Sequence, residues 1–160
     1  MTGNTDRRVE LRPSEVRRLV LEDHARLRLR LRDLRAAAEW AGTGDPSRGA
    51  ELLREAELFA DLFFRHLEME EAQLLPLLRT IDAWGSERAR LVLDEHREQR
   101  RLLLGYVRDL HDPHSGLARL ARETLALIAD IEADMLHEEE SVLSEDLLRD
   151  DVISLDPMGG

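Results

Sequence analysis

Three histidines and two glutamates in this chain have the residue types and the spacing of a metal-binding site. They are His24, His66, Glu70, His96 and Glu139. Each lies on an apolar stripe with helical periodicity, and about one helical turn separates His66 from Glu70. A single histidine on such a stripe is an ordinary core residue. Three of them in separate segments, together with buried carboxylates that need a partner, predict a site for iron, manganese or zinc inside a helical core.

The composition restricts the donors and the partners of such a site. The 160 residues include no cysteine, which excludes disulfides, thiolate zinc sites, iron–sulfur clusters and thiol catalysis. Only nitrogen and oxygen donors remain. A net charge of −11 argues against general nucleic-acid binding, and no apolar run approaches the roughly 18 residues of a membrane span. We therefore expect a cytoplasmic protein with neither a nucleic acid nor a membrane as its partner.

The elements that must position these side chains are predicted to be four long helices. The chain is rich in Leu, Arg, Glu and Ala and poor in β-branched residues, a composition that favours helices over sheets. Clusters of turn residues divide it into segments at about 14–41, 46–79, 86–111 and 116–149. Short loops join these segments, which predicts an all-α fold, an up-down antiparallel four-helix bundle over residues 14–150. Residues 1–13 are expected to form an N-terminal extension and residues 151–160 a flexible C-terminal tail.

Two local patterns test this assignment. From Arg26 to Arg32 the chain alternates Arg and Leu, which is a strand-like period. We still predict a helix there, because the run contains no β-branched residue and its flanks are helical. Pro76 lies late in the second segment, and it is expected to end or kink that helix near Leu75 because proline lacks a backbone N–H.

Helical phase, at about 100° per residue, also orients four further side chains. Met135 is predicted to face the core of the fourth segment, and His137 is predicted to face solvent. Arg28 and Arg100 fall on inward faces, one turn after two of the candidate histidines. An arginine in such a position can neutralise a buried glutamate without any metal.

The second segment carries the most specific motif. Its residues 66–76, HLEMEEAQLLP, resemble the His-x-x-x-Glu-Glu-x-x-Leu-x-Pro signature of the hemerythrin-like (HHE cation-binding) family. Glu22-Asp23-His24 and Glu95-His96 resemble the first and third histidine motifs of that family, and the likeness extends from about Val16 to Leu148. The resemblance implies an up-down four-helix bundle that holds one or two iron ions. The ligands it transfers to this chain are His24, His66, Glu70, His96 and Glu139.

The same resemblance shows two departures around the second metal position. When the fourth segment is aligned on Glu-Glu-x-Val-Leu, the last histidine of the family falls on Met135. Some hemerythrins carry a second histidine in the third segment, and that position is Arg100 here. A thioether is a poor ligand for iron. We therefore expect an incomplete second metal position, and one ion, two ions or an empty site all stay open.

Two classes of function follow from this reading. The first is a hemerythrin-like non-haem iron-binding protein that acts in oxygen or iron sensing, iron handling or the peroxide response. Its expected partners are a metal ion and dioxygen or peroxide, weak peroxidase- or catalase-like chemistry is compatible with it, and so is a homodimer. The alternative is a metal-free bundle that acts as a protein interaction or cargo module, with Arg–Glu pairs in place of a metal.

Overall fold

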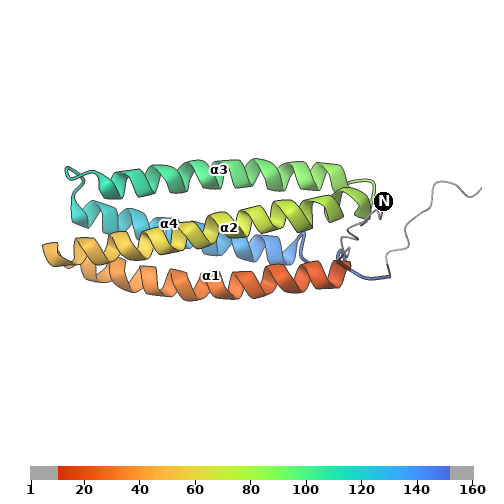
Figure 1. The fold of residues 1–160 in the computed structure, drawn as a ribbon, viewed down its shortest axis with the longest axis horizontal. Coiled ribbons are helices and arrows are strands. Elements are labelled where there is room, and N and C mark those ends of the chain that lie inside the picture. Colours follow the sequence, from red (N-terminus) through yellow and green to blue (C-terminus); the bar gives the residue numbers. More distant parts are fainter. Residues whose placement is uncertain (1–10, 152–160) are drawn as a thin grey trace, which may run out of the picture.

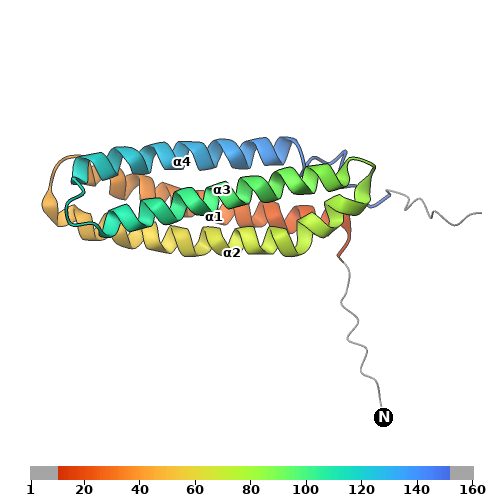
Figure 2. The same cartoon turned by 90° about the horizontal axis from the view of Figure 1, so that it is seen from above.

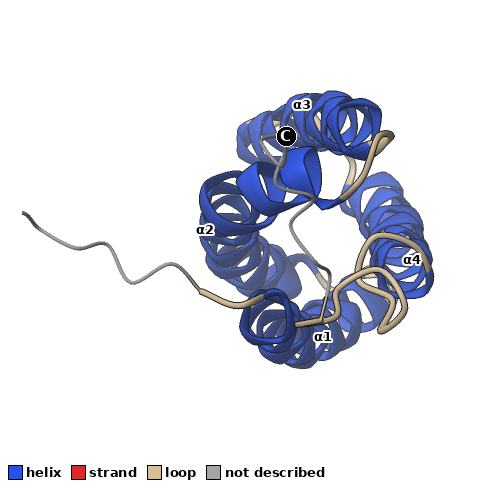
Figure 3. Cartoon of the chain, turned by 90° about the vertical axis from the view of Figure 1, so that its right-hand side faces the viewer, coloured by secondary structure: helices blue, strands red, loops and turns tan. Residues whose placement is uncertain are grey.

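The structure, a computed structural model, describes residues 11–151 as four long helices packed side by side (Figure 1). The helices are α1 Pro13–Ala41, α2 Gly49–Ile81, α3 Gly85–His111 and α4 Leu117–Glu140, with a short 3-10 turn, η1 Pro46–Arg48, before α2. Viewed along the bundle axis, α1 and α3 occupy opposite corners, and each lies beside α2 and α4 (Figure 3). The predicted all-α fold, an up-down antiparallel four-helix bundle, is confirmed.

Some sequence-based expectations fall outside the described residues. Residues 152–160 of the flexible tail expected at 151–160, and residues 1–10 of the N-terminal extension expected at 1–13, lie there. Among the residues that the structure describes, no helix is both long enough and apolar enough to cross a membrane.

Local hydrogen bonds and one close contact explain where helices begin. At the start of α1, the backbone N–H of Arg12 donates to Glu15 Oε2 at 2.9 Å. This N–H has no hydrogen-bond acceptor within the helix itself, and the Glu15 side chain supplies one. The first turn of α3 lies against the end of α2. A side chain on Gly85 would place its Cβ 1.8 Å from the carbonyl oxygen of Leu78, so only glycine permits this approach.

The fourth helix is shorter than predicted, because it ends at Glu140 and not near residue 149. The hydroxyl of Ser141 donates to the carbonyl oxygen of His137 at 2.7 Å, and the backbone leaves the helical conformation at Ser141. The chain then turns back over the end of the bundle and buries Leu143, whose carbonyl oxygen accepts a hydrogen bond from Arg17 Nε at 2.7 Å. Burial of this apolar segment accounts for the early end of the helix.

The two local patterns in the sequence have different outcomes. The stretch from Arg26 to Arg32 is helical within α1, as predicted. Helix α2 continues through Pro76 to Ile81, so the proline does not end it. Figure 2 shows the C-terminal part of α2 bending towards α3, which agrees with the kink that a proline causes in a helix.

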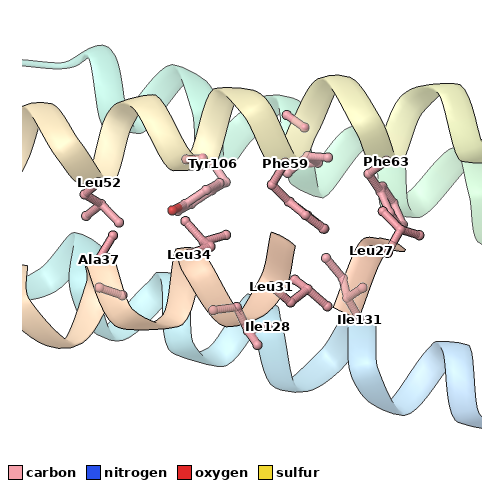
Figure 4. Close-up of a cluster of buried hydrophobic side chains, with 14 of the residues drawn as sticks. Leu27, Leu31, Leu34, Ala37, Leu52, Phe59, Phe63, Tyr106, Ile128 and Ile131 are labelled. Carbon is pink, nitrogen blue, oxygen red and sulfur yellow. The ribbon is translucent and has the colours of Figure 1, made fainter. Parts of the chain in front are cut away.

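The core consists of two apolar clusters with a polar layer between them. The larger cluster includes Leu27, Leu31, Phe59, Phe63 and Ile131 (Figure 4). The smaller cluster contains Val16, Val20, Leu74, Leu78, Val92 and Leu143. Between them the residues facing the core are histidines and glutamates. Burial of polar groups is unfavourable unless they find partners, so this interruption of an otherwise apolar core indicates a functional site.

Candidate metal centre

Every helix contributes a side chain to the polar layer. The contributors are His24 from α1, His66 and Glu70 from α2, His96 from α3 and Glu138 from α4. The three histidines and Glu70 are at most 3% exposed, and the side chain of Glu138 is 17% exposed. On each helix the polar residue lies in phase with the apolar residues one turn before and after it, which is why regular helices bring these groups to one level.

Glu70 lies at the centre of this layer and faces all three imidazole rings. Its Oε1 is 3.1 Å from His66 Nε2 and 3.6 Å from His24 Nε2. Its Oε2 is 3.0 Å from His96 Nε2. The centroids of the His24 and His66 rings are 5.0 Å apart. One buried carboxylate therefore contacts imidazole nitrogens from three helices.

Glu138 completes a four-donor group with His24, His66 and Glu70. One donor atom of each lies within 4.8 Å of the others, and Glu138 Oε2 is 3.5 Å from His24 Nε2. Donors that share an ion at about 2.1 Å lie about 3.0–3.4 Å apart, depending on the coordination geometry. The contacts of 3.1 to 3.6 Å in this group are close to that spacing.

Several buried atoms of this group lack a hydrogen-bond partner. They are His24 Nε2, both carboxylate oxygens of Glu70, and Glu138 Oε1. A buried polar atom without a partner is unfavourable by about 1–3 kcal/mol, and more when it is charged. While the imidazole rings are neutral, a cation between these atoms removes that cost, so the residues present fit a metal ion.

A carboxylate lies behind each histidine, on the Nδ1 side of the ring. The pairs are His24–Glu139 at 2.8 Å, His66–Asp23 at 3.1 Å and His96–Glu71 at 3.1 Å. An ionised carboxylate only accepts hydrogen bonds, so each Nδ1 carries the hydrogen. This arrangement orients each ring and leaves Nε2 as the nitrogen that binds a metal once the ring is neutral.

Arginines in turn neutralise these outer carboxylates. The pairs are Arg28–Glu139 at 2.8 and 3.0 Å, Arg100–Glu71 at 2.6 Å and Arg26–Asp23 at 3.3 Å. The sequence predicted inward positions for Arg28 and Arg100, but Arg28 is exposed and Arg100 is only partly buried. Each pairs with a partly buried outer glutamate. Within the described part of the chain, however, the ion pairs of Glu70 and Glu138 are with histidines and not with arginines. The arginines therefore do not take the place of a metal at the centre.

Protonation of His24 offsets part of the negative charge of the layer when no metal is bound. Burial by itself lowers the pKa of His24, but contacts with Glu138, Glu70 and Glu139 outweigh burial and raise that pKa to about 10. Burial favours the neutral form of Glu70, yet the three facing histidines hold its pKa well below the ordinary value. Burial and the nearby charge of Glu70 raise the pKa of Glu138. A metal that binds here therefore competes with protons.

Apolar side chains close the layer on the side of the larger cluster. The ring of Phe63 lies 6.0 Å from the ring of His66. A cavity of about 10 Å³, enough for roughly one water molecule, lies beside Glu70 and His96 and is also lined by Phe63 and Met135. Met135 is buried and His137 is exposed, as the helical phase predicted.

The residues predicted from the sequence and the four-donor group share His24, His66 and Glu70 and differ in three other residues. His96 contacts Glu70 but lies outside the group, and Glu139 lies behind His24 on its Nδ1 side. Glu138, which the sequence did not single out, faces the centre. Glu138 and Glu139 both lie within about 60° of Met135 around the helix axis. Helical phase alone therefore does not show which of the two faces the centre. The run of three glutamates at 138–140 was the only available signal.

The fold and this buried group of imidazoles and carboxylates are those of an all-α metal-binding protein. Comparison with known families identifies the family of this chain. Residues 16–147 match the Hemerythrin HHE cation binding domain, and the chain belongs to that family. Neither the curated proteins nor the solved structures gave a match to this chain.

Proposed function

We propose that this chain is a non-haem iron-binding protein that holds one iron ion between His24, His66, Glu70 and Glu138. The observation that carries the proposal is the set of buried donor atoms without hydrogen-bond partners in that group. Imidazole nitrogen and carboxylate oxygen together suit iron, with manganese and zinc as the other candidates. The role proposed for the protein is in the response to oxygen or peroxide, or in the handling of iron.

The surroundings of His96 support one ion over two. Met135 and Arg100 stand at the two positions where the family resemblance places further histidines. Met135 offers only a thioether, and Arg100 turns outward to Glu71 at 2.6 Å. A second ion beside His96 would share Glu70, and it would have few other donors.

When bound, iron supplies Lewis-acid and one-electron redox chemistry towards dioxygen or peroxide. The protein contributes position and shielding. Asp23 and Glu139 orient the rings of His66 and His24 through their Nδ1 atoms. Phe63 and the rest of the larger apolar cluster keep bulk water from one side of the layer. The alternative, a metal-free interaction or cargo module, has less support because the arginines reach only the outer carboxylates.

Elemental analysis of protein purified from iron-supplemented cells tests the proposal. We expect near-stoichiometric iron that is lost in Glu70→Ala and kept in Glu68→Ala, a matched control because Glu68 is exposed on the same helix. We also expect the visible absorption band of a two-iron centre to be weak or absent. Protein without metal, whose stability does not change on chelation, would contradict the proposal. Stoichiometric zinc or manganese would support the site and correct the choice of metal.

A further inference from the structure

A pocket opens to the surface beside the polar layer. Its volume is about 520 Å³, and it lies between the first half of α3 and the chain that follows the end of α4. Its apolar lining residues are Leu91, Val92, Val142 and Leu147. Binding sites for small organic molecules have volumes of about 300–1,000 Å³, and they combine apolar walls with a few polar groups. The size and the lining of this pocket are of that kind.

Two acidic residues connect this pocket to the candidate metal centre. Glu95 and Glu138 line both the pocket and the small cavity beside Glu70 and His96. Glu138 points one oxygen, Oε2, towards His24 Nε2 at 3.5 Å, and its other oxygen, Oε1, is buried without a hydrogen-bond partner. The Glu138 side chain is 17% exposed, and it belongs both to the pocket lining and to the four-donor group. A molecule at the inner end of the pocket therefore meets a side chain of the centre.

The charges around the pocket restrict what can bind. Its acidic lining residues are Glu95, Glu138 and Asp146. Among the described residues, the basic side chains that line it are His137 and Arg88, and Arg88 is held by Asp82 with an N–O distance of 2.6 Å. The net charge of the chain, −11, adds to the repulsion of anions. A carboxylate or phosphate is thus disfavoured, and a neutral molecule with a hydrogen-bond donor is favoured.

We propose that this pocket is the substrate pocket of the metal centre, and that it binds a neutral organic molecule with an apolar body and a single O–H head. This is the chemistry of an alkyl hydroperoxide. The head donates a hydrogen bond to Glu138, and the body packs on Leu91 and Val142. The inference rests on the proposed function for the role of the molecule as a substrate, but binding to the pocket does not require the metal.

The test uses the full-length, metal-free protein and 1-hexanol, an unreactive probe with the same apolar body and O–H head. Methyl groups are followed by NMR during titration. We expect saturable shifts at Leu91, Val92, Val142 and Leu147 and none at Leu102, which is exposed on α3 outside the pocket. Hexanoate, which differs from the probe by its negative head, is expected to bind at least tenfold more weakly.

Two exposed leucines of α3 provide a matched pair of variants. Leu91 lines the pocket and is 55% exposed, whereas Leu102 is 46% exposed and lies outside it. Both residues are about half exposed, so we expect glutamate at either position to leave the fold intact, and circular dichroism checks this. We expect Leu91→Glu to weaken hexanol binding at least fivefold and Leu102→Glu to change it less than twofold.

Three results would overturn the proposal. They are the absence of saturable shifts, equal weakening by the two variants, and hexanoate binding as tight as that of hexanol. Binding that appears only after deletion of residues 152–160 would assign the pocket to that segment of the chain and would also overturn it. Iron content is measured separately, so hexanol binding in a protein that takes up no iron would leave the pocket in place and refute only the proposed function.

Discussion

Replacing Glu138 and Glu139 one at a time by glutamine separates a metal ligand from a residue that positions one. Glu138 Oε2 lies 3.5 Å from His24 Nε2, within the four-donor group. Glu139 contacts the opposite nitrogen of the same ring, Nδ1, at 2.8 Å. Glutamine preserves the size of either side chain and removes its charge. The two neighbouring substitutions therefore probe the two sides of one imidazole.

The expected losses differ in size. Glu139→Gln removes the charge behind His24 and leaves Arg28 without its carboxylate partner. Groups that orient a metal-binding histidine are typically worth about 10- to 100-fold in metal affinity, or about 1.4–2.7 kcal/mol. Glu138→Gln replaces one of four donors by a neutral amide oxygen, a weaker ligand, and removes the charge of one of the central carboxylates. We expect its loss of affinity to exceed about 100-fold, the upper end of what an orienting group contributes.

The assay is competition for iron between each variant and a chelator of known affinity. Glu140→Gln is the matched control, since Glu140 is exposed and is the next residue of the same helix. Its affinity should equal that of the unchanged protein. A larger loss in Glu139→Gln than in Glu138→Gln would refute the assignment of Glu138 to the centre. An equal loss in all three variants would show that only the overall charge of this helix end matters.

Three further predictions concern other parts of the molecule. Tyr106 is the only tyrosine, and burial, opposed by a hydrogen bond with Thr124, raises its pKa to about 12. Its ultraviolet titration should have a midpoint near 12 in folded protein and about 10 in denaturant, and the stability it contributes, present below pH about 10, should be lost as the pH rises towards 12. Met135→His adds a donor beside the small cavity, and elemental analysis should show more than one iron per chain. Gly85→Ala forces a Cβ against the carbonyl of Leu78, and urea denaturation should show a loss of about 1–3 kcal/mol or more.

Each of these predictions has a result that contradicts it. A folded-state midpoint near 10 would mean that water reaches the hydroxyl of Tyr106. Unchanged iron content in Met135→His would show that a second position lacks more than this one donor. An unchanged unfolding midpoint in Gly85→Ala would contradict the close contact between the start of α3 and the end of α2.

Most of the fold was predictable because helices are specified by local sequence. The apolar periodicity and the turn clusters predicted four helices, and the phase within each predicted that His24, His66, Glu70 and His96 face the core. Burial confirms all four orientations. The predicted end of the last helix was wrong, since burial of Leu143 under the end of the bundle depends on residues far away in the chain.

What the sequence by itself determined is therefore the set of helices, the inward histidines with Glu70, and a donor set without sulfur ligands from cysteine. Only the tertiary structure decided that Glu138 faces the centre while Glu139 lies behind His24. The histidine–carboxylate pairs, whose members are 25 to 115 residues apart in the chain, also depend on the tertiary structure, and so does the pocket beside Glu138. The reason is geometric. Periodicity gives the face of a helix, but contacts between helices depend on the rotation and axial shift of each, and packing of the whole core sets these.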